Sequence, residues 1–165
     1  MGYFSKFPII YPYKFNNLKM PCIDITKRSS IVEKYKRRDS NHIEYTIRDG
    51  DTPLTIADKI YDDADLFWVI PFYNNIMDLD DDWPLKVNEL RGYISDEYGN
   101  SEGVHHYESM FDGRTVESDH PEYDRITITN YEYEYRKNEN KRSILVPIPE
   151  IARAIKNEHD RLMRS

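Results

Sequence analysis

The sequence predicts an α+β fold for a chain of 165 residues. Three patterns predict it: a strand followed by two helices between Tyr45 and Asn75, strand-like alternation over residues 125–148, and a helical stripe from Pro149 onward. The length suits one modest domain with added arms. We divide the chain into an N-terminal arm with a short strand (1–42), a strand–helix–helix module (43–94), a polar loop or insertion (95–123), and a C-terminal β-hairpin followed by a helix (124–165).

The composition indicates a protein that folds in a reducing compartment and outside membranes. Cys22 is the single cysteine, so no internal disulfide can form. Lysine and proline residues interrupt the apolar N-terminus and no cleavage site follows, so we expect no signal peptide. The longest apolar run, Phe67 to Tyr73, is far shorter than the roughly 20 residues that cross a bilayer. We therefore expect no membrane partner.

Charge is distributed unevenly along the chain, whose formal net charge is −7. Residues 1–48 carry 10 basic and 4 acidic side chains, residues 49–124 carry 4 and 20, and residues 125–165 carry 9 and 6. Basic ends therefore flank a strongly acidic middle, a pattern that suits docking onto several protein surfaces. Because the middle would repel phosphates, we expect no nucleic-acid partner.

Proline and aromatic residues dominate the first 21 residues of the chain. Pro8, Pro12 and Pro21 prevent a helix in this segment. It is either a strand tucked onto the domain or an arm that becomes ordered on a partner. In the second case its aromatic side chains would contact that partner, and the candidates are Phe4, Phe7 and Tyr11.

The module of residues 43–94 begins with a strand pattern and a helix start signal. Ile43, Tyr45 and Ile47 alternate with polar residues, as in a half-buried strand. Thr52 is placed to cap a helix that has Pro53 at its first position. Apolar residues at helical spacing follow, so the strand leads through a tight turn into an amphipathic helix.

A second, largely buried helix is predicted to start near Asp65. Pro71 lies inside it and should kink it or end it early, because proline removes a backbone donor. The strand and the two helices share a predicted core, which comprises Ile47, Ile56, Ile60, Phe67 and Ile70.

Two segments contain residues that could ligate a metal, but neither has the spacing of a known site. The acidic run from Asp78 to Glu89 places carboxylates at EF-hand ligand positions, yet Trp83 stands where that loop needs glycine. The histidines between His105 and His120 form no recognised ligand pair. We expect no metal and no cofactor. Nucleophile-elbow, P-loop and dinucleotide motifs are also missing from the sequence, so we expect no enzyme.

The last 41 residues are predicted to form a hairpin and a helix. Tyr131, Tyr133 and Tyr135 alternate with acidic residues, which favours one face of a strand that turns at "KNENK" and returns as "SILVPI". The final helix has an apolar stripe of Ile151, Ile155 and Leu162. It either packs on the hairpin or is offered to a partner. Tyrosine is favoured at protein interfaces, so the partner-binding candidates are the three tyrosines and the basic residues Arg153, Lys156 and Arg161.

The stretch "YTIRDGDTPLTIADKIYDDADLFWVI" resembles a LysM module, with its strand, its "GDT" turn, its "IA" helix and a second helix that ends in "NN". Together with "FWVI", "WPL", "YFSKFPIIY" and "DITKR", it resembles a LysM-like baseplate wedge protein of T-even-like contractile-tailed phages (myophages). The resemblance covers roughly residues 1–94 and is weak over the remainder.

The resemblance implies a structural protein of the virion, located in the tail baseplate and made in the host cytoplasm. Such a protein clamps neighbouring wedge subunits and promotes closure of six wedges around the hub. The implied partners are other wedge proteins, including the core-bundle proteins and the sheath-initiating protein.

The alternative hypothesis is a LysM-type module that binds peptidoglycan. It would hold the glycan near the turn after the first strand and the facing loop, and its candidate groove residues are Gly50, Asp51, Thr52, Asn75 and Asp78. Two departures weigh against it: Pro71 stands inside the second helix, and the loop "DLDDDW" is acidic. Retention on peptidoglycan would separate the two hypotheses.

Overall fold

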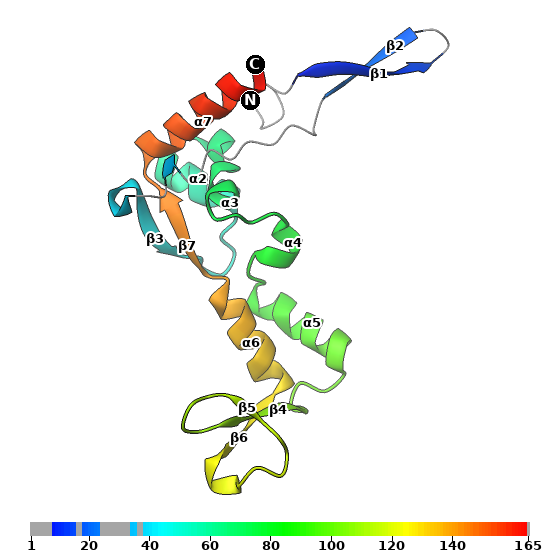
Figure 1. The fold of residues 1–165 in the computed structure, drawn as a ribbon, viewed down its shortest axis with the longest axis vertical. Helices are drawn as coiled ribbons and strands as arrows, with labels where there is room; N and C mark the ends of the chain where they lie inside the picture. Colours follow the sequence, from blue (N-terminus) through cyan, green and yellow to red (C-terminus); the bar gives the residue numbers. More distant parts are fainter. Residues whose placement is uncertain (1–7, 16–17, 24–33, 36–37, 165) are drawn as a thin grey trace. The chain divides into compact units, whose positions relative to one another are not determined.

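The computed structural model describes residues 8–15, 18–23, 34–35 and 38–164. It combines helices and strands, which confirms the predicted α+β class (Figure 1). The chain forms two compact units. Unit 1 comprises Met1–Tyr45, Asp51–Leu79 and Ile144–Ser165, and unit 2 comprises Thr46–Gly50 and Asp80–Ser143.

Most of the regular structure of unit 1 consists of two strand pairs and helical segments. β1 (Ile9–Phe15) pairs antiparallel with β2 (Leu18–Ile23). The unit also contains the first four residues of β3 and most of β7, which pair with each other. The elements that lie wholly or mostly in unit 1, besides β1 and β2, are η2 (Asp39–Asn41), β3 (His42–Thr46), α2 (Pro53–Tyr61), η3 (Ala64–Leu66), α3 (Val69–Tyr73), β7 (Ser143–Pro147) and α7 (Pro149–Arg164).

Helix α2 forms as the sequence predicts, because its start signals act together. The Thr52 hydroxyl accepts a hydrogen bond from the Thr55 amide (3.2 Å), and Thr55 Oγ1 in turn accepts one from the Thr52 amide (2.8 Å). Pro53 occupies the first helical position, where its missing N–H removes no hydrogen bond. The helix buries Ile56, Ala57 and Tyr61.

The second helix of the module is shorter than predicted. A 3₁₀ turn, η3, comes first, and α3 begins only at Val69. Pro71 is therefore the third residue of α3 and lies in its first turn, where a backbone N–H has no partner within the helix. Of the predicted core, Ile47, Ile56 and Ile70 are buried, but Ile60 and Phe67 are only half-buried. Ile43, predicted to lie on the buried face of its strand, is 47% exposed.

Asn74 ties the end of α3 to β7 within unit 1. Its side-chain amide donates to the Leu145 carbonyl (2.7 Å) and accepts from the Leu145 amide (2.9 Å). The Asn74 side chain thus makes the two hydrogen bonds to Leu145 that the backbone of a neighbouring strand would make. The helix α7 that follows β7 was predicted correctly, but its buried face is shifted. Ile151 and Leu162 are half-buried, and the fully buried positions are Ala152, Ile155, His159 and Met163.

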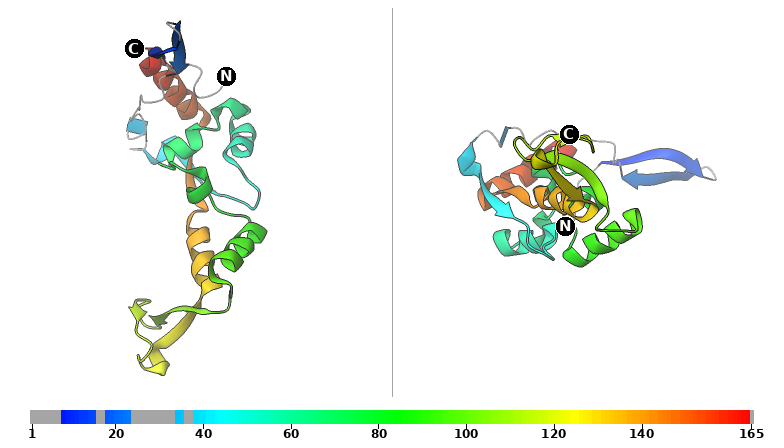
Figure 2. Two further views of the ribbon diagram at one scale, coloured as in Figure 1. Left: turned by 90° about the vertical axis from the view of Figure 1, so that its right-hand side faces the viewer. Right: turned by 90° about the horizontal axis from the view of Figure 1, so that it is seen from below.

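Unit 2 consists of a helix pair and a three-stranded sheet. The strand order is β5–β4–β6, and β4 pairs antiparallel with both neighbours. Helices α5 and α6 lie side by side in Figure 1 and in both views of Figure 2. The elements of unit 2 are α5 (Val87–Tyr98), β4 (Val104–Ser109), β5 (Thr115–Val116), η4 (Glu122–Asp124), β6 (Arg125–Thr129) and α6 (Asn130–Asn140), with most of α4 (Leu79–Asp82).

Two predictions for this part of the chain are wrong. The predicted polar loop or insertion of residues 95–123 contains the end of α5 and the strands β4 and β5. The predicted hairpin of residues 125–148 is a strand, the helix α6 and a second strand, and the two strands pair with other partners, β4 and β3.

The segment with the alternating tyrosines forms the helix α6, which has a capped start and buries residues at helical spacing. Thr129 and Glu132 form a reciprocal capping box at the start of α6. The buried positions, Asn130, Glu134 and Asn138, recur every four residues. This is a helical period, but it is carried by side chains that hydrophobic periodicity does not detect.

Candidate functional site

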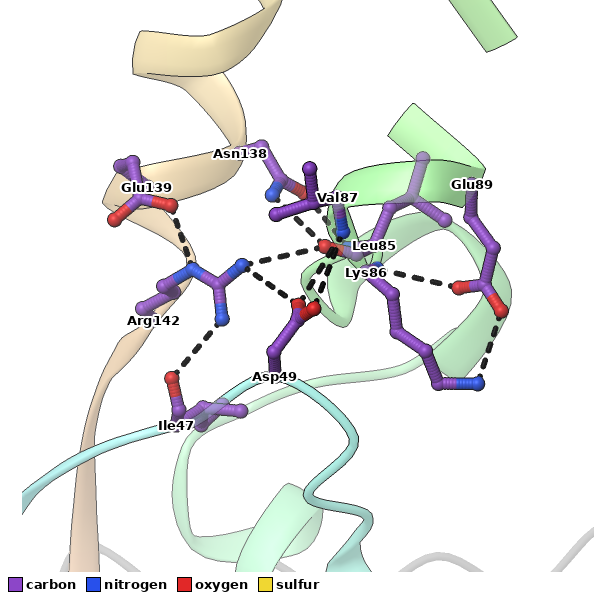
Figure 3. Close-up of polar contacts among 9 residues, drawn as sticks. All are labelled: Ile47, Asp49, Leu85, Lys86, Val87, Glu89, Asn138, Glu139 and Arg142. Atoms are coloured by element: carbon purple, nitrogen blue, oxygen red, sulfur yellow. Dashed lines mark hydrogen bonds and ion pairs between the residues drawn. The ribbon is translucent and has the colours of Figure 1, made fainter. Parts of the chain in front are cut away.

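Arg142, two residues after the end of α6, organises the polar contacts at one end of the helix pair in unit 2 (Figure 3). Its side chain is only 11% exposed. The guanidinium donates to the carbonyls of Ile47 (3.1 Å) and Leu85 (3.4 Å). It also pairs with the carboxylates of Glu139 (2.6 Å) and Asp49 (3.4 Å). Burial acts to lower the pKa of Arg142, but the two carboxylates outweigh it and raise that pKa.

Asn138 and Asp49 complete this cluster. The Asn138 amide donates to the Leu85 carbonyl (3.0 Å) and accepts from the Leu85 amide (2.7 Å). The Asp49 carboxylate accepts from the Val87 amide (3.3 Å), which lies at the start of α5. Figure 3 shows these contacts converging on the segment from Leu85 to Val87. The cluster therefore holds the start of α5 against the end of α6.

Polar side chains also join the opposite ends of the two helices. The Tyr98 hydroxyl donates to Glu134 (2.9 Å), and Lys137 pairs with the same carboxylate (3.3 Å). Burial and then the neighbouring Glu134 raise the pKa of Tyr98 to about 12. Asn130 donates to the Asn100 carbonyl (2.9 Å). Each buried polar residue of α6 therefore has a partner, as buried polar groups require.

Because α6 is a helix, the three candidate tyrosines do not share one face. Tyr131 and Tyr135 are four residues apart, and their rings stack at 5.8 Å between centroids. Tyr135 is 42% exposed. Tyr133 points elsewhere and stacks on the His105 ring at 3.8 Å. Tyr131 and Tyr135 thus form the aromatic surface of α6, and Tyr133 packs on β4.

Two open hollows flank the α5–α6 pair. One, of about 480 Å³, is lined by residues that include Arg91, Ser95 and Tyr131. The other, of about 440 Å³, is lined by residues that include Glu89, Tyr93 and Lys137. Both linings mix polar and apolar side chains, as protein-contact surfaces do. Among the residues that the structure describes, no three histidine, cysteine or acidic side chains are grouped to hold a metal.

The candidate residues of unit 1 lie in the first strand pair and on α7. Tyr11 is 57% exposed and follows Ile9 and Ile10, which are 61% and 38% exposed. On α7, Arg153 and Arg161 are exposed and Lys156 is half-exposed. Arg161 pairs with Glu158 (2.7 Å). Phe4 and Phe7 lie outside the described residues.

Two of the candidate glycan residues make hydrogen bonds within the fold, and the five candidates do not all belong to the same unit. The Thr52 hydroxyl caps α2, and the Asp51 carboxylate accepts from the Tyr45 hydroxyl (2.8 Å). Asn75 is exposed in the left-handed region at φ 57°. Gly50 belongs to unit 2, whereas the others, Asp78 included, belong to unit 1.

Comparison with known proteins identifies one family. A family model described as Base plate wedge protein 53 matches residues 3–114, about two thirds of the chain. No curated protein matches the chain. Within the described part of the chain, none of the helices is long and apolar enough to cross a membrane. The matched range includes unit 1 from residue 3 to Leu79 and, in unit 2, helix α5 and strand β4.

Proposed function

Because the chain belongs to the base plate wedge protein 53 family and is a structural component of the phage tail baseplate, we propose that it clamps neighbouring wedge subunits together. In this role it promotes closure of six wedges around the tail hub. The proposed partners are other wedge proteins, including the core-bundle proteins and the sheath-initiating protein. The protein is made in the host cytoplasm and incorporated into the tail of the virion.

One observation carries the clamping role: the chain forms two compact units that differ in charge. Unit 1 has 14 basic and 13 acidic side chains, a formal charge of +1, whereas unit 2 has 9 and 17, a formal charge of −8. A clamp needs separate surfaces for separate neighbours, and different charges favour different partners. Wedge proteins that meet unit 2 should therefore present basic or polar surface.

The strand pair β1–β2 is the leading candidate for a contact made by unit 1. It is a two-stranded sheet, and such a pair is only marginally stable in water without further packing. Ile9 and Tyr11 expose more than half of their surface. We infer that a neighbouring subunit covers these side chains, with the preceding Phe4 and Phe7 extending the contact. On α7, Arg153, Lys156 and Arg161 would face acidic surface.

In unit 2, Tyr131 and Tyr135 are the leading contact residues on α6. Stacked tyrosines present a large apolar area with polar tips, which suits a protein interface. Tyr133 would act indirectly, by holding α6 against His105 of β4. We further propose a LysM-like relationship for residues 43–94, which the order of β3, α2 and α3 supports, and a kinship to the wedge proteins of T-even-like myophages. We do not propose glycan binding.

The proposed function can be tested by assembling baseplates from purified wedges with and without the protein. We expect closed six-wedge rings in electron micrographs when it is present, and mostly free wedges when it is absent. A protein that lacks residues 1–23 should keep the helical circular dichroism signal of the full chain but give fewer rings. Full ring formation without the protein would refute the closure role, and full ring formation with the truncated protein would refute the contact by the strand pair.

A further inference from the structure

Three exposed apolar side chains lie on two adjacent backbone segments at one end of the β5–β4–β6 sheet. Met110 is 60% exposed, Phe111 is 81% exposed and Tyr123 is 80% exposed. Met110 and Phe111 follow the end of β4, and Tyr123 precedes β6. The Met110 amide donates to the carbonyl of Asp124 (3.0 Å), so the two segments lie side by side. We call these three residues the apolar knob.

Hydrogen bonds hold the backbone of the knob in place. The Ser109 amide donates to the Arg114 carbonyl (2.9 Å), and the Gly113 amide donates to the Ser109 carbonyl (2.9 Å). Gly113 has φ +70°, a conformation that few other residues adopt. The turn between β4 and β5 is therefore closed on itself. Its exposed side chains are presented on a fixed backbone, which reduces the ordering cost of binding.

A buried polar group links the two segments of the knob beneath its side chains. Asp124, only 8% exposed, accepts from the Ser109 hydroxyl (2.9 Å) and lies 2.6 Å from His120 Nε2. The Ser109 hydroxyl in turn accepts from the Phe111 amide (3.2 Å). This chain of contacts connects the backbone of Phe111 to the residue next to Tyr123. Hydrogen bonds therefore fix the two segments that carry the exposed side chains to each other.

Acidic side chains predominate in the part of the chain that carries the knob. Residues 109–124 contain five acidic side chains and one basic one, a formal charge of −4 with histidine neutral. Glu117, Asp119 and Glu122 are exposed. An apolar centre with a charged rim is the usual organisation of a protein interface. The complementary surface is an apolar pocket rimmed by lysine or arginine.

We propose that the apolar knob inserts into an apolar, basic-rimmed pocket of another baseplate protein. The inference rests on the proposed function, because it names the surface through which unit 2 holds one of its neighbours. Tyr123 lies beyond the range that the family model matches, so membership of the family does not imply this contact.

The test compares full-length variants for binding to immobilised baseplate wedges assembled without this protein. The triple variant Met110→Ser, Phe111→Ser, Tyr123→Ser should bind at least about tenfold more weakly, since large aromatic side chains dominate interface energies. The matched control is Val104→Ser, at the other end of β4, because Val104 is 54% exposed in the same sheet. Unchanged circular dichroism would exclude unfolding of the triple variant. Equal binding of the triple variant and wild type would overturn the proposal.

A second variant tests the charge of the pocket. Neutralising the rim with Glu117→Gln, Asp119→Asn and Glu122→Gln should slow association a few-fold at low salt and leave dissociation nearly unchanged. Faster association would mean an acidic rim on the partner and would overturn the proposal.

Crosslinking from position 111 identifies the occupant. A photoreactive phenylalanine analogue at this position should crosslink to an apolar peptide of another baseplate protein. Crosslinks only to a second copy of this chain would overturn the proposal that the pocket belongs to another baseplate protein. So would knob-dependent binding to vesicles of phosphatidylglycerol and phosphatidylcholine. If wild-type protein failed to bind wedges at all, the proposed function would fail, whereas loss of the knob's effect alone would leave that function standing.

Discussion

Unit 1 and unit 2 bury their helices against different kinds of side chain. In unit 1, α2, α3 and α7 bury mainly aliphatic residues, of which Ala57, Val69, Ile70 and Ile155 are fully buried. In unit 2, α5 contributes the apolar Leu90 and Ile94, but α6 buries Asn130, Glu134 and Asn138. Apolar packing is non-directional, whereas each buried polar group needs a partner at a fixed distance and angle.

The difference has consequences for how each unit tolerates change. An aliphatic core loses stability in proportion to the volume removed. A buried polar layer loses stability when one partner is removed, because the remaining donor or acceptor is left without a hydrogen bond. Unit 2 should therefore be sensitive to substitutions that keep the size of a side chain but change its hydrogen bonding.

The largest expected effect is a cavity in unit 1. Ile70→Ala removes buried methyl groups from α3 and should cost about 2–5 kcal/mol of unfolding free energy, measured by urea denaturation. Leu54→Ala on α2 is the control, because Leu54 is 52% exposed and its truncation should cost less than about 0.5 kcal/mol. A similar cost for both variants would contradict the apolar-core description of unit 1.

Removing Arg142 should be nearly as costly, but in unit 2. Arg142→Ala leaves the carbonyls of Ile47 and Leu85 without this donor and removes both ion pairs, so we expect a loss of roughly 1.5–3 kcal/mol. Hydrogen exchange should report the loss in α5 and α6. The matched control is Arg91→Ala, since Arg91 is exposed on α5. Unchanged protection of both helices would show that the cluster contributes little.

Asn138→Leu tests the polar layer without opening a cavity. The two side chains are similar in size, but leucine cannot pair with the amide and carbonyl of Leu85, so we expect a loss of about 1–3 kcal/mol. Asn140→Leu is the control, because Asn140 is exposed on the same helix. A more stable Asn138→Leu protein would mean that apolar packing could replace the polar layer.

The same contrast explains which elements could be predicted from the sequence. Helix α2 was predictable because Thr52, Pro53 and Ile56 are local signals that agree with one another. Helix α6 also carries a local signal, the Thr129–Glu132 capping box, but the alternating tyrosines suggested a strand. Its buried face could not be recognised in advance, because the partner of Asn138 is Leu85, 53 residues earlier in the chain.

The site could be predicted only in part for a related reason. The sequence predicts Tyr131 and Tyr135 as contact residues from their aromatic character, and the two form a stacked, partly exposed pair. The sequence does not single out Met110, Phe111 and Tyr123, because the two segments that carry them are brought side by side only by the pairing of β4 with β6. A single exposed aromatic residue needs no explanation, and only the fold shows that these residues lie on adjacent segments.

Acid should weaken unit 1 through His159, an effect smaller than those above. Burial lowers the pKa of His159 below its ordinary value of 6.5, despite Asp160 at 3.7 Å. The folded protein therefore keeps this ring neutral at pH values where the unfolded chain binds a proton. Protonation of His159 therefore does not reduce the free energy of unfolding above about pH 6.5. It reduces this free energy as the pH falls from there towards the folded-state pKa. Urea unfolding at pH 7.5 and 5.5 should show a smaller loss for His159→Gln than for wild type, and equal losses would contradict this assignment.

The smallest effect on stability, but a measurable one on association, is expected from the basic side chains of α7. Arg161 is 70% exposed and pairs with Glu158, and exposed pairs of this kind contribute little to folding. Unlike Arg142 in unit 2, Arg153, Lys156 and Arg161 are therefore available to steer an acidic partner surface.

Reversing all three to Glu should leave the unfolding midpoint almost unchanged and slow association with wedges several-fold at low salt. Raising the salt concentration should slow wild-type association and remove most of the difference between the two proteins, because exposed charges are screened. Stopped-flow mixing gives both rate constants. A change confined to dissociation would mean that these side chains hold the partner in a desolvated contact and do not merely steer it, which would contradict the role proposed for them.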